Sequence, residues 1–272
     1  MSKRPADPTA LGRAFRRRLR RAGAEGPPAL GCMVSEYLRP SMATLLAEAG
    51  YDFLFVETEH AFLQTPELAG FVHAARGLGL PAIAKTDLDR GEVTRLLDTG
   101  LCGLQLPRTE SPEQLAELAD YALFPPKGSR AGAPGYGSTD YRIPEDHGAW
   151  LRRANQSVSI VAHIETAEGL RNAAAIAASP HVDVVYVGPY DFSIAMGRPG
   201  DYDHPDVTGP MRRILRLCRE RRVCFGTTPS GPGTARDWVR RGAGFFELGS
   251  ELELTARAAR AEVEAYRGGS DN

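Results

Sequence analysis

The sequence lacks the features that mark a membrane, secreted or nucleic-acid-binding protein. No apolar run approaches eighteen residues, and no apolar segment follows the basic N-terminal region, so we expect neither a transmembrane helix nor a signal peptide. The 33 Lys and Arg residues nearly balance the 34 Asp and Glu residues, and a formal charge of -1 favours neither nucleic acid nor an anionic membrane as a partner. These absences favour a cytoplasmic enzyme that acts on small molecules.

Cysteine is scarce. The four cysteines form no C-x-x-C pair and have no His at zinc-ligand spacing (Cys32, Cys102, Cys218 and Cys224). Three of them lie in apolar runs, which is typical of reduced core residues. A disulfide framework and a zinc finger are therefore excluded.

A basic run at 13–21 could belong to an arm that binds nucleic acid. The alternative is a solvated helix in which Leu11, Phe15 and Leu19 form a narrow apolar stripe at four-residue spacing. The rest of the chain shows no basic surface and no aromatic stacking motif, so we favour the helix.

Short apolar runs alternate with helical patterns along the chain, which is typical of parallel βαβ units. Several runs are apolar throughout, as expected where both faces of a strand are covered by helices. Eight such units in 272 residues predict a single-domain α/β fold, the (β/α)8 TIM barrel, rather than an open sheet. The expected strands are 29–35, 52–60, 81–87, 103–108, 158–166, 182–193, 223–229 and 244–250.

The pattern also predicts how the chain is divided. We expect a basic N-terminal helix or extension over 1–28 and the barrel over 29–272. A Gly/Pro-rich loop at 125–155 has no sustained periodicity, and a loop of that length in a compact domain is usually functional or mobile. A final helix is expected at 252–267.

Polar residues fall where the apolar runs end. In a barrel of this kind the carboxyl ends of the strands meet at one mouth, where active sites are built. The sequence therefore predicts one coherent site there, from the residues Glu57, Glu59, His60, Lys85, Asp87, Arg108, Glu165, Asp191, Thr227, Thr228 and Glu247.

Two carboxylates stand out because each is a single acid after a strongly apolar run. Glu165 follows SIVAHI and Asp191 follows VVYVGPY. Buried carboxylates are costly unless they are paired, and neighbouring strand ends are close enough for two acids to share one ion. Two oxygen ligands with open positions suit Mg²⁺ or Mn²⁺. The alternative is that each acid forms a structural ion pair with Arg or Lys.

From about Gly31 to the last helix, the chain resembles the HpcH/HpaI family of class II, metal-dependent pyruvate aldolases, which includes 2,4-dihydroxyhept-2-ene-1,7-dioate and 2-keto-3-deoxy-sugar-acid aldolases. The segments that carry the resemblance are GYDFLFVETEH, RLLDTG, FPPKGSR, IETAEGLRN and VDVVYVGPYDFSIAMGRPGDYDHP. The resemblance implies a barrel assembled as a homo-oligomer, a hexamer or trimer of dimers, with the last helix exchanged between neighbours.

The resemblance also implies roles for individual residues. Glu165 and Asp191 look like the ligands of one divalent metal, Mg²⁺ or Mn²⁺ and alternatively Co²⁺, and His60 looks like the acid/base residue, oriented by Asp98. The Gly188-Pro189-Tyr190 backbone, with Thr227 and Thr228, looks like the pocket for the carboxylate of pyruvate. Arg130 in the loop is expected to reach a substrate carboxylate, in its own or a neighbouring subunit.

Three positions depart from the family pattern. Lys85 stands where the family has Arg, so it supplies a charge without the planar fork of donors. Glu57 replaces Asp, and His163 replaces Gln close to the expected metal. All three changes fall at the expected reaction centre.

The function predicted from these residues is a metal-dependent carbon–carbon lyase, an aldolase. It would form or cleave an aldol bond through a metal-bound, pyruvate-type enolate, with a 2-oxoacid and an aldehyde as partners. An alternative is another metal-enolate reaction on a 2-oxoacid, such as decarboxylation or hydrolysis, prompted by Lys85 and His163. A barrel that binds a small acid without turnover is the alternative outside enzymes.

Overall fold

A closed ring of eight parallel strands forms the centre of the protein. The computed structural model describes residues 8–23 and 25–268. The strands pair in sequence order and β8 pairs with β1, so the sheet closes on itself and the predicted (β/α)8 barrel is confirmed. The strands are β1 Ala29–Val34, β2 Phe53–Val56, β3 Ala82–Lys85, β4 Gly103–Leu106, β5 Ser159–His163, β6 Val184–Val187, β7 Cys224–Thr227 and β8 Phe245–Ser250.

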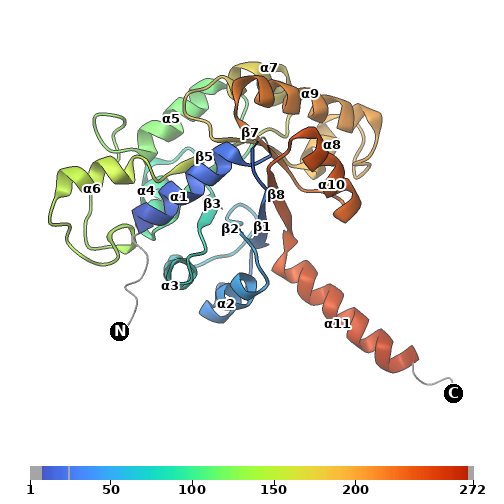
Figure 1. Ribbon diagram of the computed structural model, residues 1–272, viewed down its shortest axis with the longest axis horizontal. Coiled ribbons are helices and arrows are strands. Elements are labelled where there is room, and N and C mark those ends of the chain that lie inside the picture. Colours follow the sequence, from blue (N-terminus) through green and yellow to red (C-terminus); the bar gives the residue numbers. More distant parts are fainter. Residues whose placement is uncertain (1–7, 24, 269–272) are drawn as a thin grey trace.

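Helices surround the ring (Figure 1). None of the helices within the described residues is long and apolar enough to span a membrane. The helices are α1 Pro8–Arg21, α2 Pro40–Glu48, α3 Thr65–Gly77, α4 Arg90–Asp98, α5 Pro112–Ala122, the 3-10 helix η1 Gly137–Thr139, α6 His147–Ala154, α7 Ala167–Ala177, α8 Pro189–Ala195, α9 Pro205–Arg221, α10 Pro232–Arg241 and α11 Glu251–Gly268.

The alternation of side chains along each strand divides the core into two layers. On β2, Leu54 and Val56 point outward and pack under the helices, whereas Phe53 and Phe55 point into the barrel. The inner layer is filled by rings, with Phe53 stacked on Phe245 at 4.5 Å between centroids. The inside of the barrel toward the amino ends of the strands is therefore a packed core.

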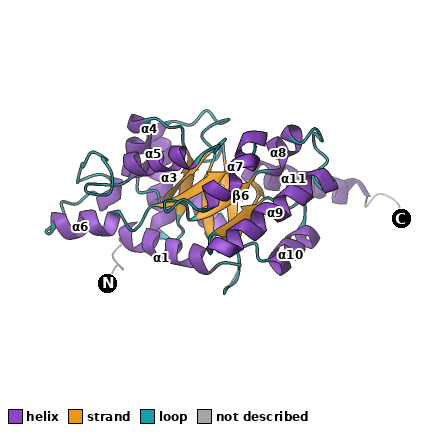
Figure 2. Cartoon of the chain, turned by 90° about the horizontal axis from the view of Figure 1, so that it is seen from above, coloured by secondary structure: helices purple, strands orange, loops and turns teal. Residues whose placement is uncertain are grey.

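Helix α1 lies across the end of the barrel opposite the strand carboxyl ends (Figures 1 and 2). Phe15 and Leu19 are buried against the inner core, and Leu11 is partly buried with them, so the predicted apolar stripe is confirmed. The arginines of this helix pair with acids of the barrel, including Arg16 with Asp183 at 2.8 Å. Residues 1–7 and 24 of the predicted extension, and 269–272 at the other end, lie outside the described residues.

The Gly/Pro-rich loop at 125–155 is more ordered than its composition predicts. It contains η1 and a complete helix, α6, which the sequence analysis did not foresee. Asp146 caps α6 by accepting a hydrogen bond from the N–H of Ala149, and Trp150 is buried 5.2 Å from the ring of Phe124. A helix of eight residues with two buried side chains, Trp150 and Ala154, is too short to give a clear period.

Arg76 on α3 fastens this loop to the barrel. Its side chain is 1% exposed, and it donates to the carbonyl of Gly137 at 2.8 Å and to Asp140 at 2.5 Å. A buried guanidinium is stable only where carboxylate and carbonyl oxygens replace its water. The position of the loop therefore depends on this contact.

Helix α11 projects away from the barrel (Figure 1). It begins at the buried Glu251, whose Oε1 accepts hydrogen bonds from the N–H groups of Ser35, Glu36 and Tyr37 at 2.7 to 3.2 Å. After the first turn its side chains are exposed. The helix is therefore held at its start and has no cover along the rest of its length within the described chain.

We expect Arg76→Ala to destabilise the protein by about 3 kcal/mol, because it leaves the buried Gly137 carbonyl without its donor and leaves the partly buried Asp140 with only the exposed Arg142, 3.6 Å away, as an ion-pair partner. The measurement is urea unfolding followed by tryptophan fluorescence, with Arg212→Ala on the exposed face of α9 as the control. A loss of less than about 1 kcal/mol would show that water replaces the guanidinium at no cost.

Candidate active site

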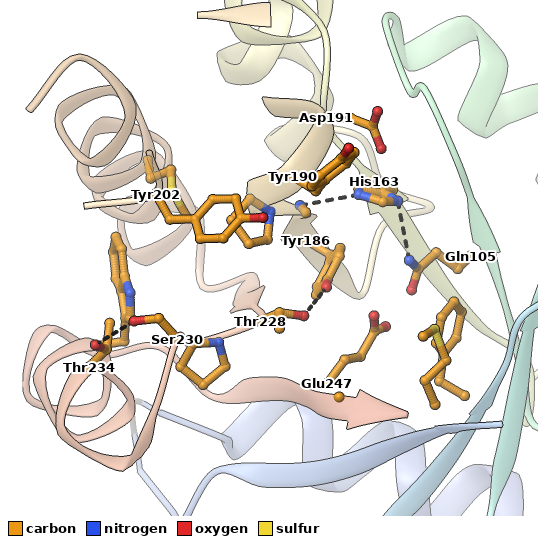
Figure 3. A pocket seen from close by; sticks show the side chains of 18 of the residues that line it. Gln105, His163, Tyr186, Tyr190, Asp191, Tyr202, Thr228, Ser230, Thr234 and Glu247 are labelled. Atoms are coloured by element: carbon orange, nitrogen blue, oxygen red, sulfur yellow. Dashed lines mark hydrogen bonds between the residues drawn. The ribbon is translucent and has the colours of Figure 1, made fainter. Parts of the chain in front are cut away.

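The barrel has a polar layer at the carboxyl ends of its strands. In five strands the residue two positions beyond an inner-core residue is polar and lines a cavity of about 380 Å³. The period of two in a strand puts these side chains on the same, inward face, one layer above the packed core. They are Lys85 on β3, Gln105 on β4, His163 on β5, Tyr186 on β6 and Glu247 on β8 (Figure 3 shows four of them).

Lys85 lies between two carboxylates. Its Nζ is 2.8 Å from Oε2 of Glu57 and 3.0 Å from Oε2 of Glu59. Burial disfavours the charged amine, but the hydrogen bonds and charges of Glu57 and then Glu59 hold the pKa of Lys85 above its ordinary value. Lys85 is therefore a fixed positive charge at the mouth of the barrel.

Glu57 shapes the turn that follows β2. Burial would raise the pKa of its carboxyl, but the hydrogen bond and charge of Lys85, together with two backbone donors, bring that pKa below its ordinary value. Those donors are the N–H groups of Glu59 at 2.6 Å and His60 at 3.1 Å. Glu57 thus links the fixed cation to the backbone that carries His60.

His60 itself stands at the rim. Its side chain is 71% exposed, and Nε2 is 3.8 Å from Oε2 of Glu59. Asp98, expected to orient His60, instead accepts a hydrogen bond at 2.7 Å from Arg130. Arg130 is buried and lies over the ring of Phe124. None of the three residues His60, Asp98 and Arg130 lines the cavity within the described chain.

Glu165 is buried directly after β5. Its Oε1 accepts the N–H of Arg108 at 2.7 Å, and its Oε2 is 3.0 Å from Nε2 of His163. Burial would raise the pKa of Glu165, but the hydrogen bond and charge of His163, the N–H of Arg108 and the charge of Lys85 bring it below its ordinary value. Glu165 is therefore an anion, and no guanidinium or ammonium of the described residues forms an ion pair with it.

His163 joins Glu165 to the neighbouring strands. Its Nε2 lies 3.1 Å from the backbone N of Gly188 and 3.0 Å from Oε2 of Glu165. When Nε2 carries no hydrogen it accepts the N–H of Gly188, and when Nε2 carries a hydrogen it donates to Glu165. Nδ1 is 3.3 Å from Nε2 of Gln105. A Cβ at position 188 would lie 2.3 Å from the imidazole, so this contact requires glycine.

Asp191 lies in the first turn of α8. The sequence analysis extended the sixth strand to residue 193, but β6 ends at Val187 and Pro189 starts a helix, whose first turn favours proline. Asp191 is exposed, lines the cavity and has no hydrogen bond or ion pair within the described residues. It is a carboxylate available to a ligand.

The expected carboxylate pocket is only partly lined as predicted. Gly188, Pro189, Tyr190 and Thr228 line the cavity. Thr227 does not, because its hydroxyl is buried and donates to the carbonyl of Val187 at 2.9 Å. Thr227 therefore ties β7 to β6.

The donors at the mouth fit a divalent metal in chemistry. Glu165 is ionised and Asp191 is unpartnered, and hard cations with retained waters accept a two-carboxylate site. Within the described residues no group of three or more His, Cys, Asp or Glu side chains forms a complete protein cage. Glu165 and Asp191 would therefore supply part of the coordination shell, and water and substrate the rest.

Glu247 and Tyr186 form a second polar group; the sequence analysis placed Glu247 at the mouth without giving it a role and did not name Tyr186. Glu247 is 5% exposed, and its Oε1 has no hydrogen-bond partner within the described residues. The hydroxyl of Tyr186 lies 2.6 Å from Oγ1 of Thr228, and Tyr186 is near enough to the Glu247 carboxyl to influence its pKa. The only signal in the sequence is an acid inside the apolar run FFELGS.

Burial raises the pKa of Glu247 to about 8, and the charge of Glu57 adds to this, whereas Tyr186 and Lys85 act in the opposite direction. The pKa of Tyr186 lies well above its ordinary value, mainly because of burial and the charge of Glu247. At neutral pH this group therefore consists of a neutral acid, a phenol and an alcohol.

Comparison with known proteins agrees with this geometry. The family model described as HpcH/HpaI aldolase/citrate lyase matches residues 33–258. The chain belongs to the HpcH/HpaI aldolase/citrate lyase family. This confirms the resemblance seen in the sequence, and with it the prediction of an aldolase-type carbon–carbon lyase.

Several relatives within the HpcH/HpaI family are similar over almost their whole length. A hydroxypyruvate/pyruvate aldolase of Delftia acidovorans is 30% identical over 97% of this chain and 93% of its own. One from Chromohalobacter salexigens is 29% identical over 91% and 97%. A crystal structure of an HpcH/HpaI family protein from Burkholderia cenocepacia, 29% identical, superposes with a TM-score of 0.85 over 94% of this chain and 99% of that one.

We expect Glu247→Gln to stabilise this HpcH/HpaI protein at alkaline pH. Because the folded-state pKa of about 8 exceeds the ordinary 4.5, the folded protein retains a proton that the unfolded chain loses, and wild-type stability falls as pH rises from 4.5 to 8. Each pH unit is worth about 1.4 kcal/mol, so the loss is at most about 5 kcal/mol. Glutamine carries no such proton.

The measurement is urea unfolding of both proteins at pH 5 and pH 8.5, with the exposed Glu48→Gln as the control. The free energy of unfolding of the variant minus that of the wild type should be larger at pH 8.5 than at pH 5. An equal gain at both pH values would mean that Glu247 is ionised in the folded protein.

Proposed function

We propose that the protein is an aldolase that makes or breaks the carbon–carbon bond beside the keto group of a 2-oxoacid through an enolate. The observation that carries this proposal is Lys85, a buried ammonium held by Glu57 and Glu59 at the mouth of the barrel. The relatives named hydroxypyruvate/pyruvate aldolase support a pyruvate-type substrate. The enolate is the anion that a fixed cation in a water-poor site stabilises.

Glu165 and Asp191 would hold one divalent ion, Mg²⁺ or Mn²⁺ and alternatively Co²⁺. When bound, such an ion supplies Lewis-acid polarisation of the keto oxygen. The low pKa of Glu165 and the unpartnered carboxylate of Asp191 support this assignment. Gly188, Pro189 and Tyr190 would bind the carboxylate of the 2-oxoacid on the neighbouring wall, whereas the hydroxyl of Thr228, expected to join them, lies 2.6 Å from the hydroxyl of Tyr186.

Lys85 acts as a charge and not as a nucleophile. A Schiff base with the keto group requires the neutral amine, but Glu57 and Glu59 raise the pKa of Lys85 and keep it protonated. The same two carboxylates fix the position of Nζ, so the single ammonium replaces the two-pronged guanidinium of the family pattern. We infer that Lys85 faces the enolate oxygen.

His60 is our candidate for the acid/base residue that moves the proton of the aldol hydroxyl. Its imidazole stands at the rim, and Glu57 fixes its backbone through the hydrogen bond to N–H. Asp98 and Arg130 form an ion pair with each other at the foot of the loop, from which they would support the rim.

The cytoplasmic location of the protein is a prediction from the sequence.

Decarboxylation or hydrolysis of a 2-oxoacid through the same enolate is the competing function. The test is pyruvate release from a panel of 4-hydroxy-2-oxoacids, with Mg²⁺, Mn²⁺ or Co²⁺ and then with chelator. We expect release that depends on metal. Proton exchange at C3 of pyruvate without cleavage would favour the competing reactions, and no turnover in either assay would leave a binding protein.

We expect Glu165→Ala and Asp191→Ala to remain folded and to bind Mn²⁺ more weakly by at least about tenfold, since even a lost outer-sphere partner costs that much. Metal titration by calorimetry measures this, with Glu168→Ala on the exposed face of α7 as the control. Unchanged Mn²⁺ affinity in either variant would remove that residue from the proposed ligand set.

We also infer that the chain assembles into a homo-oligomer through α11, by exchange of this helix between neighbours. The helix projects from the barrel and carries an exposed apolar stripe at spacings of four and three residues. Such a stripe is typical of a helix that packs against another surface. Its members are Leu252, Ala256, Ala259, Val263 and Tyr266.

The double variant Val263→Glu, Tyr266→Glu should dissociate the oligomer, because it would bury two carboxylates against the partner subunit. Light scattering after size-exclusion chromatography measures the mass, and Glu264→Lys, off the stripe, is the control. A double variant that keeps the wild-type oligomeric mass would show that α11 is not the interface.

A further inference from the structure

The cavity contains more polar groups than the proposed enolate chemistry uses. Glu247, Tyr186 and Thr228 come from three different strands or strand ends and turn toward one another in Figure 3. They belong neither to the pair of candidate metal ligands nor to the Lys85 cluster. Glu247 in particular is a buried acid whose Oε1 has no partner within the described residues.

Such an arrangement is costly unless a ligand completes it. A buried carboxyl oxygen without a partner is unfavourable, so the fold retains one only where packing or a bound molecule compensates. Met33 and Phe55 line the cavity near Glu247 and offer no hydrogen bonds. A water or a ligand in the cavity would supply the missing partner.

The charges around the cavity limit what that partner can be. Lys85 is the only Lys or Arg among the described residues that line it, and two carboxylates already pair with it. Asp191, Asp203 and Glu253 add further acidic groups to the lining. A second anionic group on the substrate, such as a phosphate or a distal carboxylate, would find no free cation here.

Hydroxyl groups, by contrast, are well provided for. Thr228, Ser230 and Thr234 follow one another along the wall formed by the end of β7 and the start of α10, and the last two hydroxyls are 2.9 Å apart. Hydroxyls that accept and donate suit a ligand that does the same. The wall therefore matches a polyhydroxylated chain.

We propose that Glu247, acting with Tyr186 and Thr228, is a specificity residue that hydrogen-bonds a hydroxyl group of an uncharged hydroxyaldehyde, the second reactant of the proposed aldolase. The proposal thus rests on the function given above and names the class of its carbonyl partner. It excludes aldehydes that carry a carboxylate or a phosphate.

The protonation of Glu247 fits this role. The ionisable groups that face it are Glu57 just after β2, Lys85 on β3 and Tyr186 on β6, whereas Met33 on β1 and Thr228 just after β7 carry no charge. With a pKa raised to about 8 by burial, the carboxyl keeps its proton at neutral pH and offers both a donor and an acceptor. Above pH 8 it would lose the donor and repel the anionic 2-oxoacid.

The experiment uses the full chain with Mn²⁺ and pyruvate as the enolate donor. It compares kcat/KM for D-glyceraldehyde, for propanal, which has the same chain length without hydroxyls, and for succinic semialdehyde, which ends in a carboxylate. We expect wild type to prefer glyceraldehyde to both by at least about tenfold. Glu247→Leu should abolish the preference over propanal, and Glu247→Gln, which still donates and accepts, should keep it.

Exchange of the C3 protons of pyruvate provides the reference, because it needs no aldehyde and should change less than about threefold in both variants. Intact exchange with an unchanged glyceraldehyde preference in Glu247→Leu would overturn the role of Glu247 and leave the aldolase standing. A wild-type preference for succinic semialdehyde would overturn the proposed substrate class.

If wild type shows neither exchange nor cleavage, the aldolase proposal fails, and binding still decides the role of Glu247. Calorimetry then compares 4,5-dihydroxy-2-oxopentanoate, whose 5-hydroxyl is the one that a hydroxyaldehyde would contribute, with 4-hydroxy-2-oxopentanoate, which lacks it. A preference for the dihydroxylated acid of about tenfold that is lost in Glu247→Leu supports the inference, and equal affinities overturn it.

Discussion

The charge balance of three buried carboxyls at the mouth of the barrel is the constraint on which the site depends. Each is compensated differently. Glu57 has an ammonium at 2.8 Å, Glu165 has a backbone N–H and an imidazole, and Glu247 retains its proton. Because only one ammonium serves the layer, the three acids cannot share a single role, and their different environments separate an ion-paired acid, an ionised ligand and a neutral donor.

This division suits a Lys at position 85, where the resemblance to the family leads us to expect Arg. A guanidinium offers a fork of donors, whereas the ammonium of Lys85 is a point charge with three donors. Glu57 and Glu59 occupy two of them and leave one direction for a substrate oxygen. The longer reach of Glu57 compared with Asp suits this clamp, because the same carboxyl also accepts the N–H groups of the following turn.

Much of the fold could be predicted because the physical signals are local. Alternating strand and helix patterns gave the barrel, and the position of polar residues after apolar runs indicated the mouth for Lys85, His163 and Glu165. The errors have local causes too. The eight residues of α6, with few buried side chains, are too few to show a helical pattern of hydrophobic residues. The segment from Tyr186 to Asp191 reads as a continued strand unless Pro189 is recognised as the start of a helix.

Contacts between distant parts of the chain were beyond the sequence. Glu247 is visible as an acid in an apolar run, but its relation to Tyr186, two strands away on β6, follows only from the register in which β6, β7 and β8 pair. Likewise, the pairing of Asp98 with Arg130 depends on how the loop at 125–155 folds back. Motif matching assigns residues one at a time, whereas these pairs are properties of the assembled ring.

The seal that α1 forms over the amino-terminal ends of the strands has a consequence for the order of events. Phe15 and Leu19 close that end, and the rings of Phe53 and Phe245 fill the space above them. In the described part of the chain, the cavity therefore opens at the carboxyl ends of the strands. Two reactants share this opening, so the one that binds deeper has to bind first and leave last.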